Sequence, residues 1–272
     1  MQSSLIITIY KSCDYLNRVL ESIRHQTVMP GEIIVTEDGE ATENKTLLDL
    51  WRDKLEIPLI HLTQKDIGNR KPLATNKGIL ASRGAYLIFL DGDCVLHRDF
   101  TKAHLDLADE KCFLTGRRVE LSPKATDFLT AEKIATGYLN GIPWRLLVDS
   151  AFGKTHHLGR FFRTPPLLRK FLVQDKILDI RGCNFSVHRK NMLAINGYSN
   201  FFSGAYGEDS DVEHRLKFLG LKMKSVKGAA IQYHLWHKTQ VKDLSNQRRL
   251  ENVVRSGNPR TDNGLVEAPA IP

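Results

Sequence analysis

Cysteine is scarce in this chain of 272 residues, which contains only four: Cys13, Cys94, Cys112 and Cys183. No two of them form a CxxC pair. Thin, irregular spacing in a chain of this length is typical of free thiols in a reducing compartment. The sequence therefore argues against a disulfide framework and against a metal bound by cysteines.

Long apolar runs are also missing. No stretch approaches the roughly 18 residues that a membrane-spanning helix needs. The N-terminal text MQSSLIITIYKS lacks a basic segment followed by a long apolar one, so we expect no signal peptide. These absences favour a cytoplasmic protein, either free or peripheral on the inner face of a membrane.

Acidic residues are fewer than basic ones. The chain has 31 Asp and Glu and 39 Lys and Arg, which gives a net charge of +8. A basic surplus suits an anionic partner such as a nucleic acid, a membrane surface or a phosphorylated substrate, or simply a solvated basic surface. Steep salt-dependent binding would reveal a nucleic-acid partner. No nucleic-acid-binding motif is present, so we expect none.

Strand-like and helical segments alternate through the first hundred residues. Apolar runs at 5–9, 32–38 and 85–93 are typical of strands buried on both faces, and helical spacing of apolar residues is seen at 14–27 and 73–82. This alternation predicts βαβ crossovers and a mostly parallel sheet covered by helices. Ligands of such sheets bind beyond the carboxyl ends of the strands, so the polar residues that follow each strand are the candidates for a site.

Asp91-Gly92-Asp93 forms the polar end of the strand-like run at 85–93. Two carboxylates one residue apart can hold a divalent cation, or one can hold the cation and the other a ribose hydroxyl. Gly92 lets the backbone bend there. Chance alone gives about one Asp-x-Asp triplet in a chain of this composition, so a solvated turn stays an open alternative.

Two motifs later in the chain contain residues of the types used in catalysis and metal binding. Glu208 and Asp209 precede an expected helix, where acids either complement the helix dipole or supply a general base. His234 and His237 follow an expected strand at 229–234 and suit a borderline metal, although they could equally flank a surface turn. Asp93 could provide the third ligand that such a site needs.

A basic loop, Gly68-Asn69-Arg70-Lys71, precedes the helical segment at 73–82. Adjacent Arg70 and Lys71 suit a diphosphate, or they could belong to a solvated loop.

Together these motifs resemble two groups of glycosyltransferases. The first 120 residues, with IIVTEDG, RKPLATNKGILASRGAYLIFLDGDC and TGRRVEL, resemble family 2 glycosyltransferases. Residues 181–237, with RGCNFSVH, YGEDSDVEHRL and YHLWH, resemble the C-terminal half of the β-1,4-galactosyltransferase group. The resemblance implies the α/β GT-A fold, a Rossmann-like, mostly parallel sheet flanked by helices, with a helical insertion and a C-terminal helix.

The expected organisation is one catalytic domain followed by a tail. Its parts are a nucleotide-sugar-binding half (1–122), a helical insertion (123–178) and an acceptor and catalytic half (179–242) within a single domain (1–258), followed by a flexible tail (259–272).

The resemblance also implies roles for individual residues. It assigns donor binding to Thr8, Tyr10, Glu37, Asp38, Arg70, Lys71, Asn76, Asp91 and Gly92. It assigns Mn²⁺ (or Mg²⁺) to Asp93, His234 and His237, catalysis to Asp209 as base with Glu208 beside it, and acceptor binding to Tyr206 and Asp211. Glu37 and Glu40 depart from the usual Asp and Ser of the family, and Tyr206 stands where the galactosyltransferases have Trp.

The activity implied is an inverting, metal-dependent transfer of a hexose from a UDP-sugar to a saccharide acceptor, either free or lipid-linked, in surface polysaccharide or lipopolysaccharide assembly. A non-catalytic nucleotide- or sugar-binding module is the alternative, in which the acids at 208–211 only cap a helix. Residues 142–174 mix apolar side chains with Arg, Lys and His, which suits either contact with an anionic membrane or ordinary packing under long basic side chains.

Overall fold

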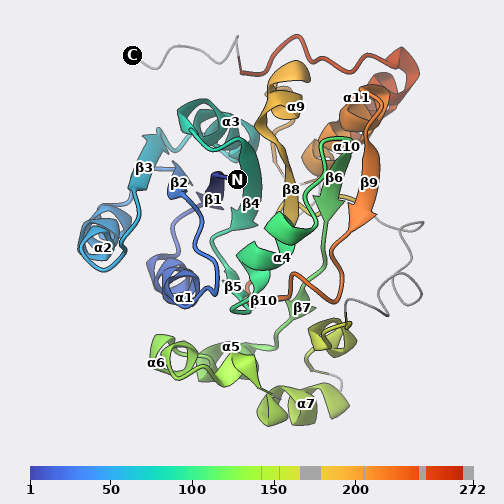
Figure 1. The fold of residues 1–272 in the computed structure, drawn as a ribbon. Coiled ribbons are helices and arrows are strands. Elements are labelled where there is room, and N and C mark those ends of the chain that lie inside the picture. The colour runs from blue at the N-terminus through green and yellow to red at the C-terminus, as the bar shows by residue number, and fades with distance from the viewer. Residues whose placement is uncertain (142, 153, 166–178, 205, 239–242, 266–272) are drawn as a thin grey trace.

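A sheet of seven strands forms the centre of the molecule (Figure 1). The structure is a computed structural model that describes every residue except 142, 153, 166–178, 205, 239–242 and 266–272. In the order β3-β2-β1-β4-β8-β6-β9, the strands are β3 (Leu59–Gln64), β2 (Glu32–Asp38), β1 (Ser3–Ile9), β4 (Tyr86–Asp91), β8 (Phe185–His188), β6 (Cys112–Thr115) and β9 (Lys222–Ser225).

The first four strands in this order are parallel, as the alternating pattern predicts. β8 runs antiparallel to both of its neighbours, whereas β6 and β9 are parallel to each other. The carboxyl ends of β1, β2, β4 and β6 therefore meet at one edge of the sheet, together with the start of β8. The predicted α/β fold with a mostly parallel sheet is confirmed.

Helices cover both faces of this sheet. They are α1 (Cys13–Arg24), α2 (Thr42–Arg52), α3 (Lys71–Ala81), α4 (Phe100–Asp106), α9 (Arg189–Ala194), α10 (Glu208–Phe218) and α11 (Ser245–Ser256). β1 shows why both faces are apolar: Leu5 and Ile7 belong to one buried cluster with α1, and Ile6 belongs to a second cluster with Ile79 of α3. A continuous apolar strand is the expected signature of such a doubly covered sheet.

A second, three-stranded sheet lies beside the first and joins distant parts of the chain. It consists of β5 (Cys94–Leu96), β10 (Gln232–His234) and β7 (Val119–Glu120). The register sets His234 opposite Cys94 on one side and opposite Glu120 on the other. The residues between 112 and 120 thus contribute one strand to each sheet, β6 to the first and β7 to the second.

The described residues of the insertion form short helices. They are α5 (Pro123–Phe128), α6 (Ala131–Ala135), η1 (Tyr138–Asn140), α7 (Trp144–Ala151) and η2 (Leu158–Phe161). α5, α6 and α7 lie together at the lower end of the molecule in Figure 1. In the part of the chain that is described, no helix combines the length and hydrophobicity needed to cross a bilayer.

The expectation of a loose tail from residue 259 does not hold for residues 259–265. Leu265 is buried in the same cluster as Ile79, and its backbone N–H donates to the carbonyl of Asn196. The Asn196 side chain donates in turn to the carbonyl of Thr261. These contacts tie the segment to the body of the protein; residues 266–272 lie outside the described part.

Candidate active site

The polar residues that follow the parallel strands gather at one edge of the sheet. A hollow of about 520 Å³ lies beyond the ends of β1 and β2 and is lined by residues 11–13 and 40–44. Thr8 near the end of β1 is half-buried, and its hydroxyl lies 3.2 Å from that of Thr75. Tyr10 is 47% exposed, and its hydroxyl donates to Asp66.

The turn after β4 sends its two carboxylates in different directions. Gly92 donates its N–H to the carbonyl of Thr8, and a Cβ added there would lie 2.2 Å from Cγ2 of Ile9. Only glycine therefore fits this close approach. Asp91 forms an ion pair of 2.7 Å with Lys71, whereas Asp93 faces two histidines.

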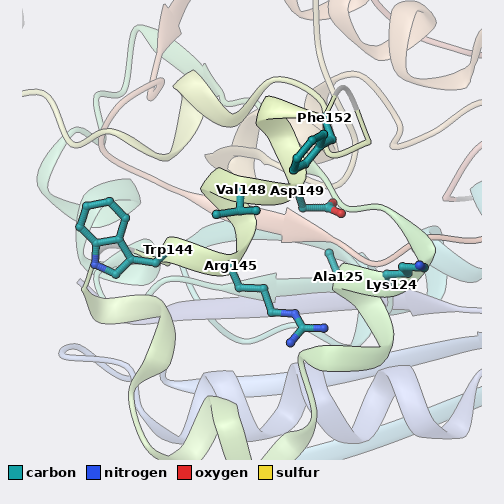
Figure 2. Close-up of a pocket in the computed structure, with 7 residues that line it drawn as sticks. All are labelled: Lys124, Ala125, Trp144, Arg145, Val148, Asp149 and Phe152. Carbon is teal, nitrogen blue, oxygen red and sulfur yellow. The ribbon is translucent and has the colours of Figure 1, made fainter.

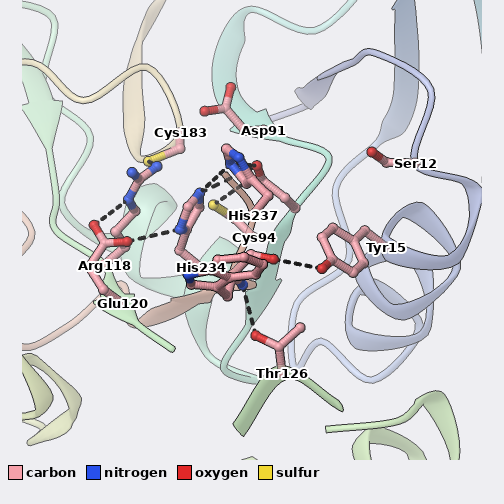
Figure 3. A network of polar contacts seen from close by, with 12 residues as sticks. Ser12, Tyr15, Asp91, Cys94, Arg118, Glu120, Thr126, Cys183, His234 and His237 are labelled. Carbon is pink, nitrogen blue, oxygen red and sulfur yellow. Dashed lines mark hydrogen bonds and ion pairs between the residues drawn. The ribbon is translucent and has the colours of Figure 1, made fainter. Parts of the chain in front are cut away.

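Asp93, His234 and His237 converge, as Figure 3 shows around the two labelled histidines. Oδ2 of Asp93 lies 3.3 Å from Nε2 of His234 and 3.0 Å from Nε2 of His237, and the two nitrogens are 3.2 Å apart. Cis ligands about 2.1 Å from an octahedral ion are themselves about 3.0 Å apart. The three ligand atoms are thus spaced as a divalent cation requires.

Hydrogen bonds at the far side of each ring orient the histidines. Nδ1 of His234 lies 2.8 Å from Oε2 of Glu120, and Nδ1 of His237 lies 3.1 Å from the carbonyl of Lys238. A protonated Nδ1 in each neutral ring leaves the lone pair on Nε2, directed at the common centre. A carboxylate behind a ligating histidine is a recurrent feature of metal sites, so the residues present fit a bound divalent cation.

The backbone between the histidines is fixed as well. The hydroxyl of Tyr15 donates to the carbonyl of Trp236 at 2.7 Å, and the N–H of Trp236 donates to Oγ1 of Thr126 at 2.7 Å (Figure 3). Helix α1 and the insertion therefore both hold the turn that presents His237.

The pKa values of Asp93, His234 and His237 depend strongly on one another. Burial alone would raise the pKa of Asp93, but hydrogen bonds from His234 and His237 hold it well below its usual range. Burial lowers the pKa of His234, but its bonds to Asp93 and Glu120 outweigh burial and raise it to about 9. Protons therefore compete with cations for this cluster, because a histidine must be neutral to ligate.

A second group of charges lies at the start of α10. Burial, followed by repulsion from Asp209, raises the pKa of Glu208 to about 7. Burial also raises the pKa of Asp209. Burial disfavours the charge of Lys71, yet the attraction of Asp91, Asp209 and Glu208 holds its pKa well above the usual range. Lys71 thus interacts electrostatically with both Glu208 and Asp209 and with Asp91 in the turn after β4.

One oxygen of Asp209 is held and the other has no partner. The N–H of Gly182 donates to Oδ2 at 2.8 Å, and a Cβ at Gly182 would lie 2.4 Å from Oδ1. Among the described residues, Oδ1 makes no hydrogen bond although it is buried. A buried carboxylate oxygen without a donor costs free energy unless another group donates to it.

Two acids expected to bind the donor have structural partners instead. Glu37 is fully buried and accepts from Asn44, from the N–H of Ala41 and from His61. Asp38 is 3% exposed, and its two oxygens accept from Gln64 and from the N–H of Arg70. These bonds hold together the loops around the hollow and leave Glu37 no access to a ligand.

Asn76 and Asp211 also differ from their expected roles. Asn76 is fully buried and bonds both the N–H and the carbonyl of Tyr198. Asp211 is fully buried in an ion pair with Arg215 one helical turn away. Arg215 also donates to two backbone carbonyls, so the pair stabilises the loop at 195–197. Asp211 does not face an acceptor.

Tyr206 and Arg70 stay close to the site. Tyr206 is 40% exposed, has a φ of 97°, and its carbonyl accepts from the buried side chain of Asn246. Arg70 donates to the carbonyl of Lys65. Arg70 therefore shapes the loop before α3 rather than leaving its whole guanidinium free.

Several residues of the site were missed by sequence reasoning. Glu120, Tyr15, Thr126 and Gly182 act through contacts with residues far away in the chain. TGRRVEL and RGCNF carry part of the family resemblance, but nothing in either motif shows which side chain meets a histidine or a carboxylate.

Comparisons with known proteins agree with this architecture. Residues 4–191 match the family model of glycosyl transferase family 2, and residues 167–238 match the model described as the N-terminal domain of galactosyltransferase. The chain is 25% identical over 243 residues to chondroitin synthase of Escherichia coli, covering 85% of this chain and 34% of that protein. It spans between 30% and 49% of the length of three curated relatives.

Two solved structures show the same fold. Residues 1–349 of TarS from S. aureus in complex with UDP align with a TM-score of 0.63 at 12% identity, covering 98% of this chain and 68% of that one. GalNAc-T7 with UDP, GalNAc and Mn²⁺ gives a TM-score of 0.65 at 14% identity, covering 94% and 48%. Both are GT-A enzymes, which confirms the predicted GT-A fold. Since the family 2 model covers more than half of its residues, the chain belongs to glycosyl transferase family 2 and is a glycosyltransferase.

Proposed function

We propose that this glycosyltransferase transfers a hexose from a UDP-sugar to a saccharide acceptor with inversion, in the assembly of a polysaccharide. The observation that carries the proposal is the pairing of two chemically distinct groups at one sheet edge. One is the convergent set Asp93, His234 and His237; the other is the buried acidic pair Glu208 and Asp209.

The donor would lie across the ends of β1, β2 and β4. The hollow lined by residues 11–13 and 40–44 would take the nucleoside, and Asp93, His234 and His237 would hold Mn²⁺ or Mg²⁺. A divalent cation there would neutralise the diphosphate and act as a Lewis acid. UDP in the TarS structure, and UDP with Mn²⁺ in that of GalNAc-T7, support this choice of donor and metal.

Asp209 would act as the general base. Its unpartnered Oδ1 accepts the acceptor hydroxyl, and the N–H of Gly182 fixes the other oxygen. A raised pKa makes the carboxylate a better proton acceptor near neutral pH. The proton passes to Asp209, the acceptor oxygen bonds to the anomeric carbon, and the bond to the diphosphate breaks on the opposite face. A single displacement of this kind inverts the configuration.

A panel of nucleotide sugars tests the proposal. With Mn²⁺, a UDP-hexose should release UDP faster than GDP- or CDP-sugars do, and chelation should stop the release. NMR of the product made from an α-linked donor should show a β-linkage. If nucleotide sugars bind but none is turned over with any saccharide, the non-catalytic binding module is the better description.

We also propose that the exposed face of α7 contacts an anionic membrane, which would present a lipid-linked acceptor. Trp144, Val148 and Phe152 are 69%, 57% and 74% exposed, and with Lys124 and Arg145 they line a hollow of about 410 Å³ (Figure 2). Apolar and cationic groups so mixed suit a membrane interface.

Flotation with vesicles tests this contact. The protein should rise with phosphatidylglycerol vesicles at low salt, and Trp144→Ala with Phe152→Ala should weaken that binding several-fold. Recovery of the wild type in the soluble fraction would contradict the proposal. Of the surface expected at 142–174, residues 142, 153 and 166–174 lie outside the described part of the chain.

A further inference from the structure

A cluster of arginines lies on the side of the metal-ligating triad opposite the nucleoside hollow. Arg117 follows β6 and Arg181 precedes β8, and both strand ends meet the sheet edge where β4 delivers Asp91. The hollow lies on the other side of β4, at β1 and β2. Figure 3 shows the same order, with Arg118 and Glu120 on one side of the histidines and Ser12 on the other.

Three of the four guanidinium groups in this cluster pair with two carboxylates. Asp179 pairs with Arg117 at 2.6 Å and with Arg181 at 3.4 Å. Glu120 pairs with Arg118 at 2.8 Å but also binds His234. The positive charge is therefore only partly compensated within the described residues.

Arg160 is the least compensated member. Its Nη1 donates to the carbonyl of Arg118 at 3.0 Å, and no described carboxylate lies within ion-pair distance of it. Burial lowers the pKa of Arg160, and repulsion from Arg117, Arg181 and Arg118 lowers it further, against a smaller opposing attraction from Glu120. Holding cations together against their repulsion is unfavourable unless an anion joins them.

The cluster touches both halves of the catalytic edge. Arg181 adjoins Gly182, whose N–H binds Asp209. The backbone of His156 pairs with that of Glu120, and Glu120 orients His234. The positive charge of Arg181 also lowers the pKa of Asp209, so an anion bound at Arg181 would lie near the hydroxyl that meets Asp209.

We propose that Arg160 and Arg181 form a subsite for an anionic group of the acceptor, either a carboxylate or a phosphate, so that the acceptor is an acidic glycan. This inference rests on the proposed function. Guanidinium groups suit both anions, because their planar fork matches two oxygens at once. Arg117 and Arg118, held by Asp179 and Glu120, add long-range attraction.

Binding of three matched probes tests the subsite. They are methyl β-glucoside, methyl β-glucuronide and methyl β-glucoside 6-phosphate, titrated by NMR with saturating UDP and Mn²⁺ so that the donor site is filled. A charged probe should bind about tenfold more tightly than the neutral one, and high salt should remove the difference. The better of the two charged probes identifies carboxylate or phosphate as the anion.

Two variants assign the effect to these residues. Arg160→Gln with Arg181→Gln should remove the preference for charge while leaving the affinity for UDP unchanged. Arg163→Gln is the matched control, since Arg163 lies in the same segment but pairs with Asp99 at 2.6 Å. If the double variant unfolds early in thermal denaturation, Arg181→Lys serves instead, because it keeps the charge and loses the fork.

Two results would overturn the inference. One is equal binding of the neutral and charged probes by the wild type. The other is a loss of UDP affinity in the variant as large as the loss of probe affinity, which would place the arginines on the donor. UDP release from the donor without acceptor is a separate measurement, so failure of the proposed transferase activity is distinguishable from failure of the subsite.

Discussion

Two pairs of adjacent carboxylates, Glu37-Asp38 and Glu208-Asp209, are chemically alike but have opposite surroundings. Three hydrogen-bond donors surround Glu37, and both oxygens of Asp38 are bonded. Burial raises the pKa of Glu208 and of Asp209, and Oδ1 of Asp209 has no described partner. The first pair therefore fits a structural role, whereas the second pair fits a reactive one.

The electrostatics of the two pairs follow from these surroundings. Burial pushes the pKa of Glu37 up, but hydrogen bonds from His61 and Asn44 push it below its usual range. For Glu208, burial and the neighbouring Asp209 outweigh the attraction of Lys71 and a backbone hydrogen bond, and they raise its pKa to about 7. The number of donors around a buried carboxylate thus separates a structural acid from a reactive one.

Among the variants that test this contrast, Asp209→Asn should have the largest effect. It should lower the rate of transfer by about a thousandfold, because the amide cannot take the hydroxyl proton. UDP affinity, measured by calorimetry, should change less than twofold. Asp38→Asn is the matched variant, and an equal loss of transfer in a well-folded Asp38→Asn would break the comparison.

The metal-ligating set of Asp93, His234 and His237 gives the next largest expected effect. His237→Ala should weaken Mn²⁺-dependent UDP binding by about a hundredfold, since it removes one of three converging ligands. Glu120→Gln should weaken it by about tenfold, because the carboxylate only orients His234. His25→Ala, which alters a histidine on α1 paired with Glu21, should leave binding unchanged. Equal losses in all three variants would indicate unfolding rather than a metal site.

The pH dependence of turnover sharpens the contrast further. Asp209 must be ionised to accept a proton, and burial raises its pKa, so kcat should rise with pH and reach its plateau only above the usual range of an aspartate. Because the pKa of Glu208 is raised on folding, its contribution to stability is complete below its unfolded pKa and is lost as pH rises through about 7. A rate that is flat from pH 5 to pH 8 would contradict the assignment.

Glu37→Gln should have the smallest effect on activity and a clear one on stability. Loss of the charged acceptor for Asn44 and His61 should cost about 1–3 kcal/mol of unfolding free energy in urea titrations at pH 7. The pKa of Glu37 is lowered on folding, so its contribution is present above its unfolded pKa and is lost as pH falls through the folded one. The deficit of the variant should therefore shrink in acid. An unchanged urea midpoint at pH 7 would show that Glu37 is not structural.

Sequence reasoning reached the elements whose signals are local. The runs at 5–9 and 32–38 become β1 and β2 because an apolar strand of that length is stable only inside a covered sheet. It also placed Asp91 and Asp93 at the sheet edge, since polar residues that end a parallel strand emerge there. Residues 259–265 pack more firmly than a loose tail would, because Leu265 is buried in a cluster that includes residues of α3 and β4.

The sequence by itself determined the alternation of strands and helices, the doubly covered sheet and the identity of the acids and histidines available for chemistry. Only the tertiary structure decided which of them act together. Asp211 and Asp209 are two residues apart, yet one pairs with Arg215 inside the core and the other accepts from the N–H of Gly182 and keeps one oxygen without a described partner. The physical reason is that the reactivity of a carboxylate depends on burial and on its donors, and β7, β8 and β10 supply those from distant parts of the chain.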